Sequence, residues 1–390
     1  MLAASAAVVL LGASLFASPV AASGGSWAQF GYAPTRSGYN PGETTLNPGN
    51  VGKLKPIWQI DLGAPSSSGP AVVGTRVFIT AGDGSVVALD RATGKTLWRT
   101  ALGTSAGGQA PAVYGSLVIV TGDNSGGGFV AAFNVSSGKL VWRTAIAAPG
   151  STATPAIYGS SVFLASAGTV YDIAAATGKV IWKKVVTTSA DGYIDGPVAV
   201  SGYGQYVIAA GLDGWVYNLT ATKGGIHWKV KAGFGIHRGG PSIYNGIIYV
   251  PEGQEQAEGA SDLVAIQVSD GNILWRTYDG GDVHITPAAG AGRVFVGEID
   301  DFVRAFDAKT GKLLWQSPIS VECFGAPVLA NGVLYLGTDM EVEAFNAATG
   351  QQLFASGLGT TYASTSSMAV LDGRVYSGSG SGTVHVFGLP

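Results

Sequence analysis

The chain has 390 residues, of which 46% are hydrophobic and only 12% are charged, and its formal net charge is −3. An ordinary soluble domain is about 25% charged, so this composition, without any basic cluster, excludes an electrostatic surface for nucleic acid or anionic lipid. Sixty glycines and seventeen prolines indicate many tight turns, and the single cysteine, Cys323, excludes an intramolecular disulfide and a multi-cysteine metal site.

The N-terminus carries the longest apolar run, Ala3 to Phe16, followed by small residues through Ser23. This pattern predicts a signal peptide over residues 1–23 that is cleaved around Ala21 to Ser23. No Lys or Arg precedes the run, which is atypical, but about 14 apolar residues are too few to span a bilayer comfortably. We therefore expect an exported protein, either secreted or in the periplasm or cell envelope, with no transmembrane segment in the mature chain.

After a lead-in segment at residues 24–52, an aromatic anchor recurs along the chain with regular spacing. Neighbouring anchors are 39 to 47 positions apart, at Trp58, Trp98, Trp142, Trp182, Trp228, Trp275, Trp315 and Phe354. Such spacing indicates repeated copies of one structural unit.

Each anchor follows a turn such as Asp90 to Lys95, in which Asp or Asn begins the turn and a glycine near its end takes the left-handed conformation. Alternating strands lie upstream, such as Gly84 to Asp90 and Arg76 to Thr80. A first strand opens with proline, where a missing N–H does least harm, at Pro70, Pro111, Pro155, Pro197, Pro241, Pro287 and Pro327. The unit is therefore four short antiparallel strands, with almost no helical periodicity.

Repeated radially, this unit predicts an all-β, eight-bladed β-propeller of four-stranded antiparallel blades over residues 53–390. Seven full blades run from Pro70 to about residue 356, and the tail from Ser364 to Gly388 supplies only three more strands. We expect the fourth strand of the last blade to be the N-terminal strand, Lys53 to Leu62, which carries Trp58. Closing the last blade in this way removes an open edge that would otherwise aggregate.

An Asp or Asn, then Thr-Gly-Lys, then Leu-Trp, as between Asp307 and Trp315, resembles the repeat of the pyrroloquinoline-quinone (PQQ) propeller family. The resemblance covers about residues 55 to 388, and the lead-in, with Trp27 to Phe30 and Arg36 to Gly38, is similar to the segment that precedes such propellers. It implies that the tryptophans dock adjacent blades together. It does not by itself give a reaction, because function depends on the sites that a fold carries.

Two branches of this family imply different functions. Quinoprotein alcohol dehydrogenases are much longer, hold PQQ and calcium at the axis and commonly place two adjacent cysteines over the cofactor, whereas Cys323 stands alone between Glu322 and Phe324. The other branch resembles the outer-membrane assembly factor of the Bam complex, which binds partner proteins without a cofactor. That factor is usually a lipoprotein, and this sequence lacks the lipidation cysteine. Chain length and cysteine count favour the cofactor-free branch, and no motif specific for PQQ or calcium is present.

The candidate site lies among the residues just before each opening proline, because these enter the innermost strands and ring the axis on one face. Histidines and carboxylates there would serve as general bases, and an arginine beside a carboxylate would clamp a polar ligand. The candidate catalytic residues are Asp195, His237, His284 and Glu322. The candidate cofactor-binding residues are Arg238, Gln109, Tyr193 and Tyr362.

Two interpretations of this mouth stay open: its polar residues contact a ligand, or they are polar only because water wets them. Farther out on the same face, Asp83 and Asp213 each precede a glycine and are expected to be turn residues. The leading hypothesis is an exported, monomeric binding or scaffold propeller that recognises a protein, an envelope polymer or a small ligand at the mouth. The alternatives are a PQQ- and calcium-dependent alcohol or sugar dehydrogenase, and a cofactor-free lyase or hydrolase that uses the mouth histidines.

Overall fold

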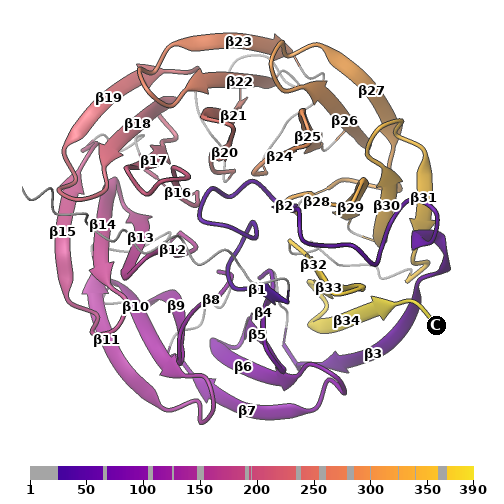
Figure 1. Cartoon of the computed structure of the whole chain (residues 1–390). Helices are drawn as coiled ribbons and strands as arrows, with labels where there is room; N and C mark the ends of the chain where they lie inside the picture. The colour runs from indigo at the N-terminus through magenta and orange to yellow at the C-terminus, as the bar shows by residue number, and fades with distance from the viewer. Residues whose placement is uncertain are drawn as a thin grey trace, which may run out of the picture.

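The computed structural model describes residues 25–64, 68–103, 109–124, 127–146, 153–188, 193–194, 196–233, 239–253, 261–278, 285–298, 300–323, 325–338, 340–358 and 367–390. The expected signal peptide lies outside these ranges. The described chain is an all-β, eight-bladed propeller (Figure 1), as predicted, and its one helical element is the 3-10 turn η1 (Val51–Lys53). Within the same ranges, no helix is long and apolar enough to cross a membrane.

Each of the first seven blades is built from four consecutive antiparallel strands, ordered from the axis outward. Blade one contains β4 (Ala71–Val73), β5 (Arg76–Ala81), β6 (Ser85–Asp90) and β7 (Thr96–Ala101), and blade two contains β8 (Ala112–Tyr114), β9 (Leu117–Asn124), β10 (Gly127–Asn134) and β11 (Leu140–Ile146). Blade three contains β12 (Ala156–Tyr158), β13 (Ser161–Ser166), β14 (Thr169–Ala174) and β15 (Val180–Val185), and blade four contains β16 (Ala199–Val200), β17 (Tyr206–Ala210), β18 (Trp215–Thr220) and β19 (Ile226–Lys231). Blade five contains β20 (Ser242–Tyr244), β21 (Ile247–Gly253), β22 (Ser261–Gln267) and β23 (Ile273–Tyr278). Blade six contains β24 (Ala288–Gly290), β25 (Arg293–Gly297), β26 (Phe302–Asp307) and β27 (Leu313–Pro318), and blade seven contains β28 (Val328–Ala330), β29 (Val333–Gly337), β30 (Val342–Asn346) and β31 (Gln352–Ala355).

The innermost strands differ slightly from the prediction at their first residues. The prolines were expected to open these strands, but β4 begins at Ala71, one residue after Pro70, and β16 begins at Ala199, two residues after Pro197. A proline has no N–H to donate to the ladder, so the pairing starts beyond it.

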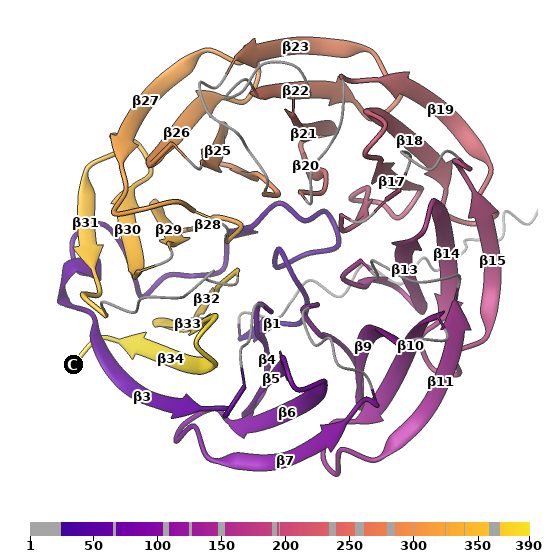
Figure 2. The same ribbon diagram turned by 180° about the vertical axis from the view of Figure 1, so that it is seen from behind.

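Blade eight is closed by strands from both ends of the chain, as predicted. Its strands β32 (Ala369–Leu371), β33 (Arg374–Gly378) and β34 (Thr383–Gly388) come from the C-terminal tail, and the outer strand β3 (Lys55–Asp61) pairs antiparallel with β34. Figures 1 and 2 show β3 beside β34 on the circumference, so the ring has no open blade.

The tryptophan anchors join each blade to the next, which confirms the role that the family resemblance implied. Trp98 on β7 donates its Nε1–H to the Val135 carbonyl of blade two at 3.0 Å, and its ring lies over Gly138, whose φ is 67°. A Cβ at Gly138 would fall 2.7 Å from ring atoms, so this position needs glycine for space as well as for its backbone conformation. The same indole-to-carbonyl bond joins Trp58 to Arg91, Trp142 to Ala175, Trp182 to Ala221, Trp228 to Val268, Trp275 to Ala308 and Trp315 to Ala347.

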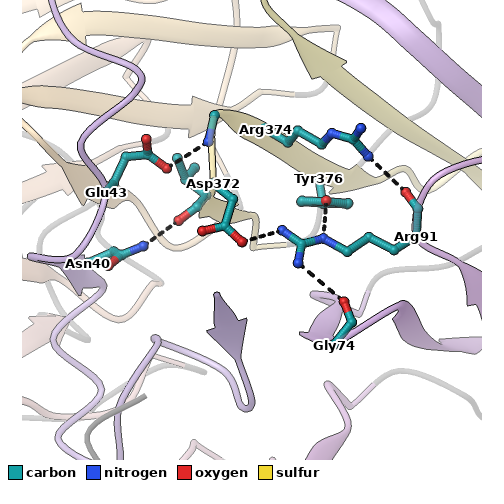
Figure 3. A network of polar contacts seen from close by, with 9 residues as sticks. Asn40, Glu43, Gly74, Arg91, Asp372, Arg374 and Tyr376 are labelled. Carbon is teal, nitrogen blue, oxygen red and sulfur yellow. Dashed lines mark hydrogen bonds and ion pairs between the residues drawn. The ribbon is translucent and has the colours of Figure 1, made fainter. Parts of the chain in front are cut away.

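The seam between blades eight and one carries an additional polar network (Figure 3). Arg91 donates from Nη2 to Asp372 at 2.8 Å, from Nε to the Tyr376 hydroxyl at 2.8 Å and from Nη1 to the Gly74 carbonyl at 3.3 Å. Arg374 donates in turn to the Arg91 carbonyl at 3.1 Å. The Arg91 position is the one whose carbonyl accepts from the tryptophan of the preceding blade. In the other six blades with such a bond this position holds alanine or valine, so the network is specific to the seam.

Replacing Arg91 with alanine is expected to lower the free energy of unfolding by about 2 kcal/mol, because a largely buried side chain loses two hydrogen bonds across the seam, to Asp372 and Tyr376, and one within blade one, to Gly74. Urea unfolding and amide exchange of β3 and β34 measure the effect. Arg76→Ala, which removes a neighbouring arginine whose Nε is buried without a hydrogen-bond partner, is the control. An equal loss of stability in both variants would contradict a specific role of the Arg91 network at the seam.

A buried carboxyl group in blade three marks a second departure from the repeat. The residue opposite each anchor aromatic is alanine in five blades and Val386 in blade eight, but it is Asp172 in blade three and Asn218 in blade four. Asp172 is 3% exposed, and burial raises its pKa to about 6. Asn218 is fully buried and donates to the Val268 carbonyl at 2.9 Å.

Because the folded protein favours the protonated form of Asp172, stability is lost as the pH rises from about 4 through about 6. Asp172→Asn is therefore expected to stabilise the protein at pH 8 by at most about 3 kcal/mol, the equivalent of two pKa units, with the gain vanishing below about pH 4. Thermal melts at both pH values measure it. Asn218→Asp should show the opposite pH dependence, and parallel melting curves for Asp172→Asn and wild type would contradict the assignment.

Candidate functional site

The lead-in segment passes around the propeller axis and meets the innermost strands of the blades in order. It begins with β1 (Ser26–Trp27), which pairs antiparallel with β4, and ends at the axis with β2 (Tyr39–Asn40), which pairs parallel with β28. Between them, the central N–H groups of successive innermost strands donate to lead-in carbonyls: Val113 to Ala28, Val200 to Pro34, Ile243 to Thr35, Ala289 to Ser37 and Leu329 to Gly38. Figures 1 and 2 show this indigo segment crossing the centre of the ring.

Side chains complete the circuit where the lead-in backbone does not reach. The Gln29 amide accepts from the Ile157 N–H at 2.8 Å and donates to the Ile157 carbonyl at 3.2 Å, in the way a neighbouring strand would. The Asn40 amide donates to the Val370 carbonyl of blade eight at 2.7 Å. All eight innermost strands are thus hydrogen-bonded toward the axis by one segment of chain.

Arg36 lies at the centre of this segment and is completely buried. Its guanidinium donates to the carbonyls of Phe30 at 2.6 Å, Val198 at 3.1 Å and Thr154 at 3.1 Å. Burial lowers the pKa of Arg36 to about 9. Three main-chain carbonyls from the lead-in and two blades hold this cation, so Arg36 ties the lead-in to the ring.

The lead-in forms a floor directly beneath the mouth that the sequence predicted. The space between Arg36, Phe30 and Trp27 of the lead-in and the strand starts at Thr286 and Ser367 is only ≈ 10 Å³, on the scale of one water molecule. Among the described residues, the lead-in therefore occupies the axis at this level and leaves little space beside blades six to eight.

Polar side chains on the described rim link neighbouring blades. Thr80 of blade one donates to the Gln109 carbonyl at 2.9 Å, and Thr154 of blade three donates to the Gln109 side-chain oxygen at 2.9 Å. On the other side of the ring, Gly240 donates to the Thr286 hydroxyl at 2.9 Å. These bonds favour the interpretation in which this part of the rim is polar for structural reasons. They already use the side-chain oxygen of Gln109.

Five of the eight predicted site residues lie outside the described residues: Asp195, His237, Arg238, His284 and Tyr362. Of the other three, Tyr193 is 46% exposed while its carbonyl accepts from Leu212 at 2.8 Å, so a fixed backbone presents the ring to solvent. Glu322 is exposed beside Cys323, which is buried and donates its N–H to the Glu298 carbonyl at 3.3 Å. The assignment of these residues to a ligand stays a prediction.

The structure also shows a charged cluster that sequence reasoning missed. Glu298 is fully buried at the end of β25 and forms an ion pair with Arg304, which also binds Asp300 through two bonds of 2.7 and 3.1 Å. Glu252 occupies the equivalent position in blade five and is 1% exposed. An alignment of the eight repeats reveals both glutamates as unusual, because this position holds small or hydroxyl residues in the other blades.

The expected turn residues behave as predicted. Asp83 accepts from the Ser85 N–H at 3.0 Å and pairs with Arg99, and Asp213 accepts from the Trp215 N–H at 3.2 Å. In the described ranges, no three His, Cys, Asp or Glu side chains lie close enough together to hold a metal ion.

Comparisons with known proteins support the propeller family. The model of the family described as outer membrane protein assembly factor BamB matches residues 54–277 and 260–388. Tetrathionate hydrolase of Acidithiobacillus ferrooxidans is 27% identical over 238 residues, which cover 55% of this chain and 46% of the relative. BamB of Bordetella pertussis is 31% identical over 154 residues, 38% of each chain. The matched region thus spans less than half the length of these two curated relatives.

Two solved structures are similar in fold. BamB from Moraxella catarrhalis superposes with a TM-score of 0.69 at 19% identity, covering 86% of this chain and 97% of the other. Quinohemoprotein alcohol dehydrogenase from Comamonas testosteroni superposes with a TM-score of 0.71 at 14% identity, covering 93% and 80%. At these identities, the likeness bears on the fold alone.

Arg36→Ala is expected to open the floor, because three buried carbonyls lose their donor and the side chain leaves a cavity. We expect the amides of Val200, Ile243 and Ala289 to lose their exchange protection by tenfold or more (~1.4 kcal/mol), as measured by hydrogen–deuterium exchange. Thr44→Ala, at an exposed lead-in position, is the control. Unchanged protection in Arg36→Ala would show that the backbone bonds alone hold the floor.

Proposed function

Because the chain belongs to the family described as outer membrane protein assembly factor BamB, we propose that it is an exported propeller that acts as a binding scaffold. Its binding surface is the mouth of the central channel, and its occupant is a protein partner of the cell envelope. The signal-peptide pattern of residues 1–23 supports export. Relatives named as outer membrane assembly factors support an envelope location.

The closed floor is the observation that carries this proposal. The lead-in lies along the axis and is hydrogen-bonded to the innermost strand of every blade, and the space between it and blades six to eight is ≈ 10 Å³. We therefore expect a ligand at this face to be recognised by the rim. A polar rim with an exposed aromatic such as Tyr193 is typical of protein recognition, where Tyr is enriched.

The described residues at the axis do not fit a quinone cofactor. PQQ carries three carboxylates and acts with calcium in the dehydrogenase branch, so its site needs free cationic donors and a cluster of metal ligands. Arg36 already donates to three carbonyls, and no metal-ligand cluster is found among the described residues. We therefore derive no redox step for this chain.

A hydrolase is the second candidate, because one relative is named tetrathionate hydrolase and is similar to just over half of this chain. The residues for such chemistry would be His237 and His284, at equivalent places in neighbouring blades. Both lie outside the described residues, so the binding proposal, which stands on the floor and the rim, is better supported.

Photo-crosslinking from the mouth tests the proposal. With a benzophenone amino acid in place of Tyr193, we expect one discrete adduct with one protein of the cell envelope, identified by mass spectrometry. The matched control is the same replacement at Tyr203, which is 86% exposed in the turn after β16, on the opposite face. Glu322→Ala should weaken the Tyr193 adduct about tenfold, if the exposed carboxylate contributes a charge-assisted hydrogen bond.

Three other outcomes would contradict a mouth-binding scaffold. Equal adducts from Tyr193 and Tyr203 would indicate non-specific contact. Saturable binding of PQQ and calcium at one per chain, without an adduct, would favour the dehydrogenase. Turnover of tetrathionate that is lost in His284→Ala would favour the hydrolase.

A further inference from the structure

A cavity of ≈ 270 Å³ lies between blades six and seven on the face opposite the mouth. One wall comes from the start of β25, at Arg293 and Phe295, and the other from the turn after β30, at Asn346 to Ala348. Its volume is near the lower end of the roughly 300–1,000 Å³ that small-molecule pockets occupy. It is separated from the mouth by the closed floor.

The lead-in builds the apolar part of this cavity. After leaving the axis it runs outward over blade seven (Figure 1), and Tyr39 and Pro48 line the cavity. Gly290 makes room for Tyr39, because a Cβ there would fall 2.6 Å from the ring. The lead-in also packs against the turn of blade eight on this face, through Glu43 and Thr45 at Gly373.

The cavity is also lined by one cation, Arg293, which lies opposite Asp307 in the ladder of β25 and β26. Arg293 is half-buried, its Nε is buried without a hydrogen-bond partner, and no described residue forms an ion pair with it. Arg374, the first residue of the equivalent strand in blade eight, instead donates to the Arg91 carbonyl at 3.1 Å. The Asn346 side-chain oxygen accepts from Ala348 at 2.9 Å, which fixes the rim of the cavity.

We propose that this cavity is a binding site for a small amphipathic anion, with its apolar body against Tyr39, Pro48 and Phe295 and its carboxylate on Arg293. An apolar enclosure favours burial of a hydrophobic body. A guanidinium without a partner favours an anionic oxygen acid, which it binds through two parallel hydrogen bonds. The site goes beyond the scaffold function and stands independently of it, because it lies on the other face.

Isothermal titration of the purified chain with 1-naphthylacetate tests the site, with neutral 1-naphthylacetamide as the matched probe. We expect the carboxylate to bind at one per chain and the amide to bind at least tenfold more weakly. Arg293→Gln should abolish this preference, and Ala348→Phe, at an exposed rim position, should block both probes. Arg76→Gln changes the equivalent arginine of blade one and should leave binding unchanged.

Absence of carboxylate binding to the wild-type chain would overturn the proposal. So would equal affinity for the two probes, or an equal loss in Arg293→Gln and Arg76→Gln. Circular dichroism and melting temperature of each variant show that a loss reflects the site and not the fold. None of these outcomes bears on crosslinking from Tyr193, so failure here is distinguishable from failure of the scaffold proposal.

Discussion

The unpaired backbone edge of the innermost strand of each blade is the constraint on which the rest of this structure depends. A buried N–H or carbonyl without a partner costs free energy comparable to a lost hydrogen bond, and eight such edges converge on one axis. The lead-in satisfies them one after another. It pairs β1 with blade one and then uses backbone carbonyls at Ala28, Pro34, Thr35, Ser37 and Gly38 and the side-chain amides of Gln29 and Asn40. A segment placed before the repeat thereby becomes the centre of the fold. The closed floor follows directly, because the chain that pairs these edges also occupies the space between them.

The junction between blades seven and eight lacks the tryptophan that joins the other blades. Seven junctions are held by a tryptophan that donates to a carbonyl of the next blade and covers a glycine there, but the phenylalanine anchor of blade seven has no such donor. The lead-in compensates at that blade, where η1 packs against β31 and Gly52 approaches the Leu353 carbonyl. The seam between blades eight and one retains its tryptophan bond and adds the Arg91 network. The junction where the chain ends meet thus carries an arginine network in addition to the tryptophan bond that the junctions between consecutive blades use.

The features that all copies of the repeat share could be predicted from the sequence. The spacing of the anchors was sufficient to predict the eight blades, the four-stranded unit and the closing strand with Trp58. Each copy of the repeat packs in the same way, so an ambiguous copy can be interpreted by comparison with the others. The spacing could not predict the path of the lead-in, since Gln29 and Arg36 find their partners more than a hundred positions away. The pair of Glu298 and Arg304 was missed for a similar reason, as their pairing depends on how β25 and β26 project side chains at one end of blade six. Of the candidate site, Gln109, Tyr193 and Glu322 could be placed in the structure, and their ligand remains a prediction.

A propeller whose axis is occupied by its own lead-in presents two faces on opposite sides of that segment. Arg36 is the barrier between them: it is fully buried, and its three carbonyl acceptors come from the lead-in and from two blades. Under the proposals made above, the mouth and the cavity beside Arg293 bind independently, and coupling between them would have to pass through the lead-in, which contributes to both. That segment lines the space beneath the mouth with Phe30 and lines the opposite cavity with Tyr39, only a few residues farther along. Because its backbone is hydrogen-bonded to every blade between these two points, a displacement at one end would have to break several bonds before it reached the other. The geometry therefore favours a rigid, two-sided adaptor over an allosteric one.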